Sequence, residues 1–202
     1  MKKNDENKSF TYLKNVINSY YLISEKTWEK FLEICEYMEV KKGDYLCRIN
    51  EIPSSFLFVN KGLLRTYILD DKGIEYNKIF FTEGMFPASI VSLLKNKPSE
   101  FELQALEDCQ LIQIDFKKYR KLLKEDEDLK LFHISYLEEN WLIKKEEKEV
   151  SIVQKDADER YEDFLNDHPT LESRLTQYHI ASHLGITPTQ LSRIRKKINI
   201  CK

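Results

Sequence analysis

The sequence predicts an α+β protein: an N-terminal antiparallel β sandwich or barrel, then a long helix, then two short helices joined by a tight turn. In the first half, short β-branched and aromatic runs alternate with polar glycine turns, which is typical of a sandwich or barrel. The stretch from Asp126 to Val153 contains neither glycine nor proline, which favours a long helix. The stretch from Leu175 to Lys197 combines a helix stop and a helix start within about three residues.

The glycine turns delimit the predicted strands. They are centred on Gly43, Gly62, Gly73 and Gly84. We expect strands within residues 56–59, 63–69, 74–81, 102–106 and 110–114. Ahead of them, Ser24 is suited to be the N-cap of a helix. The apolar residues of that helix, at helical spacing, are Trp28, Phe31, Leu32 and Cys35.

The long helix is expected to join two copies of the chain. It exceeds twenty residues, which is more than a domain of this size covers, and such helices often pack against a second copy of themselves. The alternative is that the helix lies along its own barrel. We therefore expect a barrel domain with flanking helices at 1–125, a dimerisation helix at 126–154 and a third domain at 155–202.

The third domain is predicted to contain a helix-turn-helix. Asp156 begins a helix that ends before His168-Pro169. Thr176 can cap the next helix, and Gly185 suits the left-handed residue that follows its end. Thr187 can then cap a final helix with Pro188 at its first position, where a missing N–H costs nothing.

The final helix has a polar face suited to DNA. Leu191, Ile194 and Ile198 share one side, and an α-helix of this kind fits the major groove. The predicted base-reading residues are Thr189, Gln190, Ser192 and Arg193. The predicted phosphate contacts are Thr176, Thr187, Lys196 and Lys197. The exposed face offers no apolar residue to insert into a membrane.

Composition agrees with an anionic partner for this segment. The chain has 202 residues, with 32 Lys and Arg against 34 Asp and Glu. Residues 171–202 carry six basic residues and one acidic residue, a net charge of +5. Because the whole chain has a net charge of −2, residues 1–170 have a net charge of −7. No apolar run is long enough to span a membrane, and four widely spaced cysteines suit reduced thiols. We expect a cytoplasmic protein.

This order of elements resembles the Crp/Fnr family of bacterial transcription regulators over nearly the whole chain. The matching motifs are KKGDYLCRINEIPSSFLFVNKGLLRTY (41–67), PSEFELQALEDCQL (98–111), DADERYEDFL (156–165) and LGITPTQLSRIRKK (184–197). The resemblance implies a cyclic-nucleotide-binding-like jelly roll, a homodimer on a near-palindromic operator, and contact with RNA polymerase. Arg193 matches an arginine that the family retains. We expect no C-terminal wing hairpin, because the sequence ends just after this helix.

The resemblance breaks at the effector site. Ser89 stands where members that bind cyclic AMP have a glutamate, and Ser99 stands where they have an arginine for the phosphate. Losing the arginine removes the charge-assisted hydrogen bonds to that phosphate, so the effector is expected not to be cyclic AMP. The residues of a candidate effector pocket are Phe86, Ser89, Ser99 and Phe101.

Other functions find little support in the sequence. Phosphate-binding glycine loops and nucleophile elbows are absent, so no catalytic residues are assigned. His179 and His183 have metal-ligand spacing but no third ligand, and we interpret them as polar surface or phosphate-facing residues without a metal. No cofactor is expected. The alternative to a DNA-binding regulator is a small-molecule sensor whose C-terminal helices dock a protein partner.

Overall fold

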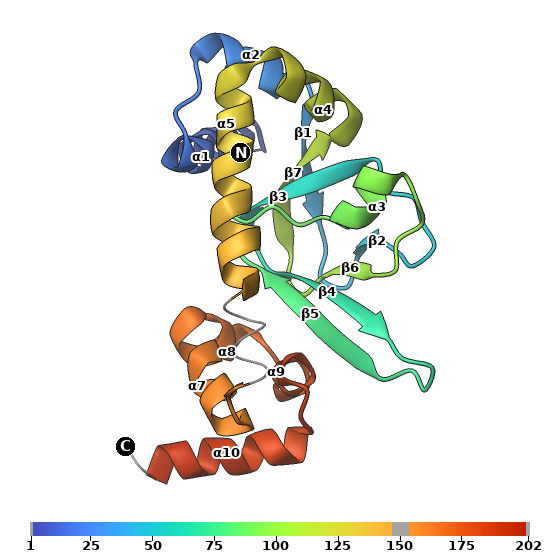
Figure 1. Ribbon diagram of the computed structural model, residues 1–202, viewed down its shortest axis with the longest axis vertical. Coiled ribbons are helices and arrows are strands. Elements are labelled where there is room, and N and C mark those ends of the chain that lie inside the picture. Colours follow the sequence, from blue (N-terminus) through green and yellow to red (C-terminus); the bar gives the residue numbers. More distant parts are fainter. Residues whose placement is uncertain (1, 147–153, 201–202) are drawn as a thin grey trace. The chain divides into compact units, whose positions relative to one another are not determined.

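Seven antiparallel strands in two sheets form a β sandwich in the computed structural model (Figure 1), which describes residues 2–146 and 154–200. One sheet has the order β1-β7-β3 and the other β2-β6-β4-β5. The strands are β1 (Cys35–Val40), β2 (Tyr45–Cys47), β3 (Ser55–Lys61), β4 (Leu64–Leu69), β5 (Glu75–Phe81), β6 (Glu102–Ala105) and β7 (Cys109–Asp115). The predicted α+β fold class is confirmed.

Helices cover one face of the three-stranded sheet. On that face Phe56, Phe58, Ile112 and Ile114 project from β3 and β7 into an apolar cluster. The cluster is completed by α1 (Lys2–Tyr20), α2 (Glu25–Leu32), α4 (Phe116–Glu125) and α5 (Glu127–Leu137). A short helix, α3 (Ile90–Lys95), lies between β5 and β6 in the chain. The opposite face of the sheet is directed to the interior of the sandwich.

The five predicted strands are present, but some of the other elements were not predicted. Helix α1 and strands β1 and β2 precede the glycine-delimited runs. Ser24 caps α2 as predicted, since its hydroxyl accepts from the backbone N–H of Thr27 at 3.2 Å. The prediction that Cys35 belongs to this helix is wrong. Cys35 begins β1 opposite Ile114, because pairing with β7 outweighs the helical spacing.

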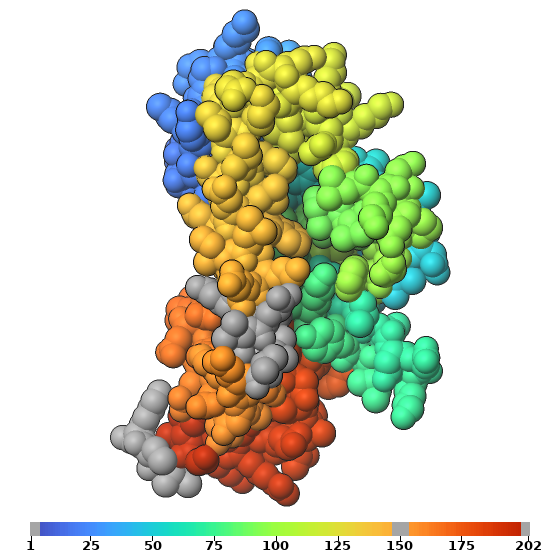
Figure 2. Space-filling model, viewed as in Figure 1, coloured from blue at the N-terminus to red at the C-terminus, as the bar shows by residue number. Residues whose placement is uncertain are grey.

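The long helix begins where the sequence predicts. Helix α5 continues without interruption into η1 (Glu138–Ile143), a π-helical turn, and helical backbone extends to Glu146. Its exposed side chains form a strip along the surface of this part of the chain (Figure 2). Residues 147–153 of the predicted dimerisation helix lie outside the described residues.

The chain divides into two compact units. The first comprises Met1–Thr66 and Phe80–Trp141, and the second comprises Tyr67–Ile79 and Leu142–Lys202. The second unit contains α7 (Ala157–Asp167), α8 (Leu171–Arg174), α9 (Gln177–Leu184) and α10 (Pro188–Ile200). Asp156 caps α7 as predicted, and with Glu159 it forms a capping box.

Most of the β4–β5 hairpin, residues 67–79, belongs to the second unit, where β5 contacts α9. Asn77 of β5 is fully buried, and its backbone N–H donates to Ser182 Oγ at 3.0 Å. That hydroxyl donates to the carbonyl oxygen of Glu75 at 2.6 Å. His183 Nδ1 lies 2.8 Å from the carbonyl oxygen of Asn77, so this ring nitrogen carries a proton. Side chains of α9 thus satisfy backbone groups of an edge strand, and His183 is half-buried rather than polar surface.

Candidate nucleic-acid interface and internal cavity

The turn between α9 and α10 has the chemistry that the sequence predicts. Thr176 Oγ1 accepts from the backbone N–H of His179 at 3.2 Å and caps α9. Gly185 ends that helix in the left-handed conformation, with φ of 68°, and Ile186 N donates to the carbonyl of Ala181. Thr187 Oγ1 accepts from Gln190 N at 3.1 Å at the start of α10. Hydrogen bonds therefore hold both ends of α9, the turn and the start of α10.

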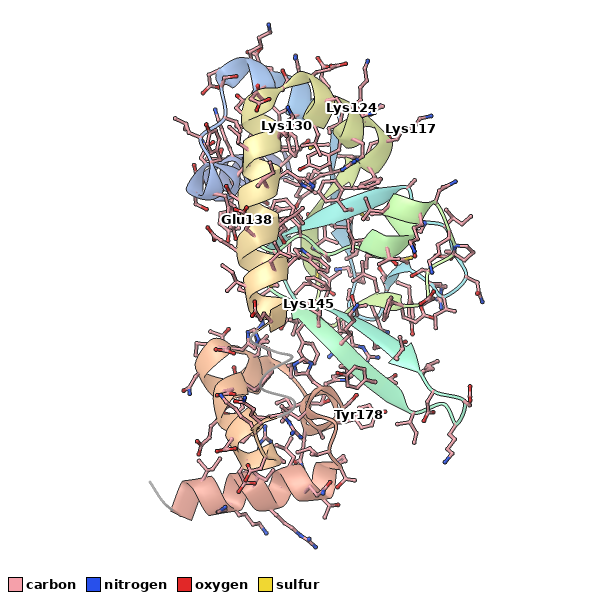
Figure 3. The ribbon with its side chains drawn as sticks, in the orientation of Figure 1. Lys117, Lys124, Lys130, Glu138, Lys145 and Tyr178 are labelled. Carbon is pink, nitrogen blue, oxygen red and sulfur yellow. The ribbon has the colours of Figure 1, made fainter. Side chains whose placement is uncertain are left out.

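Helix α10 separates its apolar and polar residues as predicted. Leu191 and Ile194 are buried, and Ile198 is half-buried. Thr189, Gln190, Arg193, Lys196 and Lys197 are exposed, and Ser192 is half-buried. Side chains with nitrogen at their tips extend from the side of α10 that faces away from α7 and α9 (Figure 3). The predicted reading face is therefore accessible.

Gln190 has a structural role in addition to its predicted contact with a base. Its Oε1 accepts from the backbone N–H of Thr187 at 2.9 Å and from Thr187 Oγ1 at 3.1 Å. With the reciprocal bond from Gln190 N, these contacts form a capping box at the start of α10. The side-chain oxygen of Gln190 thus holds the start of α10.

A buried tyrosine anchors α10 through Arg195. Arg195 Nε donates to the hydroxyl of Tyr161 at 3.0 Å, and that hydroxyl donates to Glu172 Oε1 at 2.5 Å. Arg195 Nη2 lies 3.4 Å from the same carboxylate oxygen. Burial raises the pKa of Tyr161, and the bond to Glu172 raises it further, so the hydroxyl stays protonated and can donate. Arg195 therefore holds α10 against α7 and α8. In the sequence it was only one of the basic residues of 171–202, with no separate role.

The two lysines near the end of α10 differ. Lys197 Nζ lies 2.5 Å from Asp158 Oδ2 on α7, although its side chain is 71% exposed. Within the described part of the chain, Lys196 makes no ion pair and is exposed. An intramolecular carboxylate competes with any phosphate for Lys197 and not for Lys196.

A cavity of about 320 Å³ that is partly open to solvent lies in the first unit. Its residues come from both sheets, from residues 51–54 and from residues 87–89. They are Met38, Tyr45, Leu46, Cys47, Glu51, Ile52, Pro53, Ser54, Ser55, Leu57, Pro87, Ala88, Ser89, Leu103 and Gln113. The volume suits a small organic ligand.

Only one of the four predicted pocket residues lines this cavity. Ser89 does so, whereas Phe86 belongs to the apolar cluster beneath the helices. Ser99 is buried, with its hydroxyl 2.9 Å from that of Ser89 and 2.8 Å from the carbonyl oxygen of Phe101. Phe101 is half-buried and does not line the cavity. The order of amino acids does not identify the other lining residues, because they come from strands and loops that meet only in the folded sandwich.

Three buried serines, Ser89, Ser92 and Ser99, lie at or beside the cavity. Ser89 Oγ donates to Ser92 Oγ at 3.0 Å, and Ser92 Oγ lies 3.2 Å from the carbonyl oxygen of Pro98. The hydroxyls of Ser89, Ser92 and Ser99 thus hydrogen-bond to one another. Serine is uncharged, so these residues offer no positive charge to a phosphate. Burial also raises the pKa of the Cys47 thiol, which keeps this lining group neutral. Within the described residues, His, Cys, Asp and Glu form no group of three that could hold a metal ion.

Comparison with known proteins identifies the sandwich. The model of the cyclic nucleotide-binding domain family matches residues 37–126. The regulator CLP of Xanthomonas campestris, described as responsive to c-di-GMP, is 18% identical, with a TM-score of 0.70 over 88% of this chain and 92% of that chain. FixK2 of Bradyrhizobium japonicum is 18% identical, with a TM-score of 0.69 over 83% and 85% of the two chains. A protein of Eubacterium rectale assigned to the Crp/Fnr transcriptional regulators is 23% identical, with a TM-score of 0.61 over 88% and 84%.

These similarities establish the fold. The chain has a cyclic-nucleotide-binding-type β sandwich followed by C-terminal helices, the architecture of Crp/Fnr-type transcriptional regulators. A search of curated protein sequences found no matching relative. Among the described residues, every helix is too short or too polar to cross a membrane.

Proposed function

We propose that this protein is a sequence-specific, DNA-binding transcription regulator of the Crp/Fnr type that acts as a cytoplasmic homodimer. The observation that carries the proposal is the exposed polar face of α10 on a capped helix-turn-helix. In this proposal, residues 1–125 sense an effector other than cyclic AMP, residues 126–154 dimerise, and residues 155–202 bind DNA. RNA polymerase is the expected protein partner at the promoter.

Each exposed residue of α10 has a specific role in this proposal. Arg193 can bind a guanine edge through two hydrogen bonds, and Thr189, Gln190 and Ser192 contact neighbouring bases. Thr176 and Thr187 start their helices and lie where phosphates approach a helix N-terminus. Lys196 and Lys197 hold phosphates on the groove wall. Two copies related by a two-fold axis would read half-sites about 34 Å apart.

The exposed apolar residues of the long helix support a dimer. Ile134, Leu142 and Ile143 are 43%, 64% and 54% exposed, respectively. Burying such side chains against a second copy would stabilise the pair by removing apolar surface from water. Sedimentation at micromolar concentration should give a dimer, and a monomer would contradict this part of the proposal.

Titration of random duplex DNA at two salt concentrations tests DNA binding. We expect binding at low salt that weakens as salt rises, followed by enrichment of a near-palindromic sequence in repeated selection. The Arg193→Ala variant serves as the control for base reading. Absence of binding at low salt would contradict DNA binding and favour a sensor whose C-terminal helices dock a protein.

The ion pair between Lys197 and Asp158 makes the two terminal lysines unequal in DNA binding. Lys196→Ala should weaken binding to all sequences and should reduce the slope of log affinity against log salt concentration by about one. Lys197→Ala should change affinity and slope less, because Asp158 already neutralises the Lys197 ammonium. Asp158→Asn should strengthen binding by releasing Lys197. The measurement is DNA affinity over a range of salt concentrations, and equal slopes for the two lysine variants would refute the difference.

A further inference from the structure

The cavity has a polar pair, Gln113 and Ser55, on the face of the three-stranded sheet that is turned away from the helices. Gln113 on β7 lies opposite Leu57 on β3, so both point to the same face of the sheet. That face is directed away from the helices and toward the cavity, which both residues line. Gln113 Nε2 donates to Ser55 Oγ at 2.7 Å.

This pair retains hydrogen-bonding capacity. A primary amide has two donor hydrogens and an oxygen with two lone pairs, and a serine hydroxyl can both donate and accept. One bond between them uses only part of that capacity. Both side chains are half-buried, so water can meet the donors and acceptors that this bond leaves over. A ligand with an amide or hydroxyl can take the place of that water.

The charges around the cavity disfavour an anion. Among the described residues no Lys, Arg or His lines it, and the only lining carboxylate is the exposed Glu51. The guanidinium of Arg48 lies over the ring of Tyr45, with its central carbon 3.9 Å from the ring centre, and is not part of the lining. An anion bound in this cavity would therefore lose part of its hydration without gaining a cation. The lining also offers apolar side chains, among them Met38, Leu46, Leu57, Pro87 and Leu103.

We propose that this cavity binds a small uncharged organic molecule with an apolar body and one amide- or hydroxyl-type end, which Gln113 and Ser55 hold. The inference rests on the proposed function in one respect, which is that this molecule is the effector of the regulator. Binding itself requires no DNA. The same lining excludes anionic phosphodiesters as tight ligands.

Benzamide and benzoate are matched probes for this proposal, since they share size and shape and differ in charge. Ligand-observed NMR on the full chain without DNA should detect benzamide binding, with benzoate roughly tenfold weaker or more. Benzamide affinity should fall roughly fivefold in Gln113→Leu, which removes the amide partner. Ala88→Phe, which fills the cavity at residues 87–89, should abolish binding.

Urea unfolding of both variants shows whether a loss of benzamide binding is caused by misfolding. If one of the two variants does not fold, the other still tests the proposal. Equal affinity for benzoate, benzamide binding that neither variant changes, or no benzamide binding up to its solubility limit would each overturn the proposal. The DNA titration above is performed separately. A wild-type protein that binds benzamide and not DNA would refute the regulator and leave the cavity's ligand class standing.

Discussion

Arg193→Ala is expected to cost about 1–3 kcal/mol of binding free energy on the preferred operator and to relax base choice at the contacted position. Arg193 is exposed on the polar face of α10, and the buried Leu191 and Ile194 fix that face by packing toward the rest of the unit. A guanidinium reads guanine through two parallel hydrogen bonds, which alanine cannot make. The measurement is a comparison of operator and single-base variants by titration.

Arg193→Lys is the matched control. Lysine keeps the positive charge but lacks the planar fork of arginine. We expect Arg193→Lys to retain most of the salt-dependent affinity and still to lose discrimination at the same base. If Arg193→Ala left operator preference unchanged, the base-reading role of Arg193 would be wrong.

Gly62→Ala is expected to destabilise the sandwich by about 3 kcal/mol or more, since backbone strain and overpacking add at this position. Gly62 has φ of +108°, a conformation that side chains rarely adopt. A Cβ at Gly62 would lie 2.5 Å from Cys109 Sγ and 3.0 Å from the backbone oxygen of Asp108. Backbone atoms cannot move aside as the end of a long side chain can. Urea unfolding of the variant measures the loss.

Gly43→Ala separates the two causes. Gly43 has φ of +95°, but a Cβ there would meet no atom within 4 Å. This variant should lose only the backbone part, about 1 kcal/mol. Equal losses for Gly43→Ala and Gly62→Ala would show that the close approach to Cys109 is unimportant.

Much of the fold could be predicted from local signals. Glycines at positive φ, such as Gly62 and Gly185, mark turns that the sequence reveals directly. Strand β1 could not be predicted, because Cys35 continues a helical spacing and becomes a strand only by pairing with β7. Helix α1 begins in a polar stretch, and its buried face depends on residues such as Leu13 and Ile17 that pack on distant parts of the chain.

The candidate sites divide in the same way. The exposed face of α10 follows from its own periodicity, so the order of its amino acids is enough to identify the residues on it. The Asp158 partner of Lys197 comes from a different helix, which periodicity does not reveal. The cavity is the extreme case. Gln113 and Ser55 lie on neighbouring strands but 58 positions apart in the sequence, so only strand pairing brings their side chains together.

The membership of residues 67–79 in the second unit limits how this protein can be recombined. The polypeptide passes between the two units three times, and its last passage lies near residue 141. A chimera that transplants only the residues after that passage would carry Ser182 and His183 without the strand they bond. A chimera that exchanges the C-terminal helices should therefore move residues 67–79 together with them.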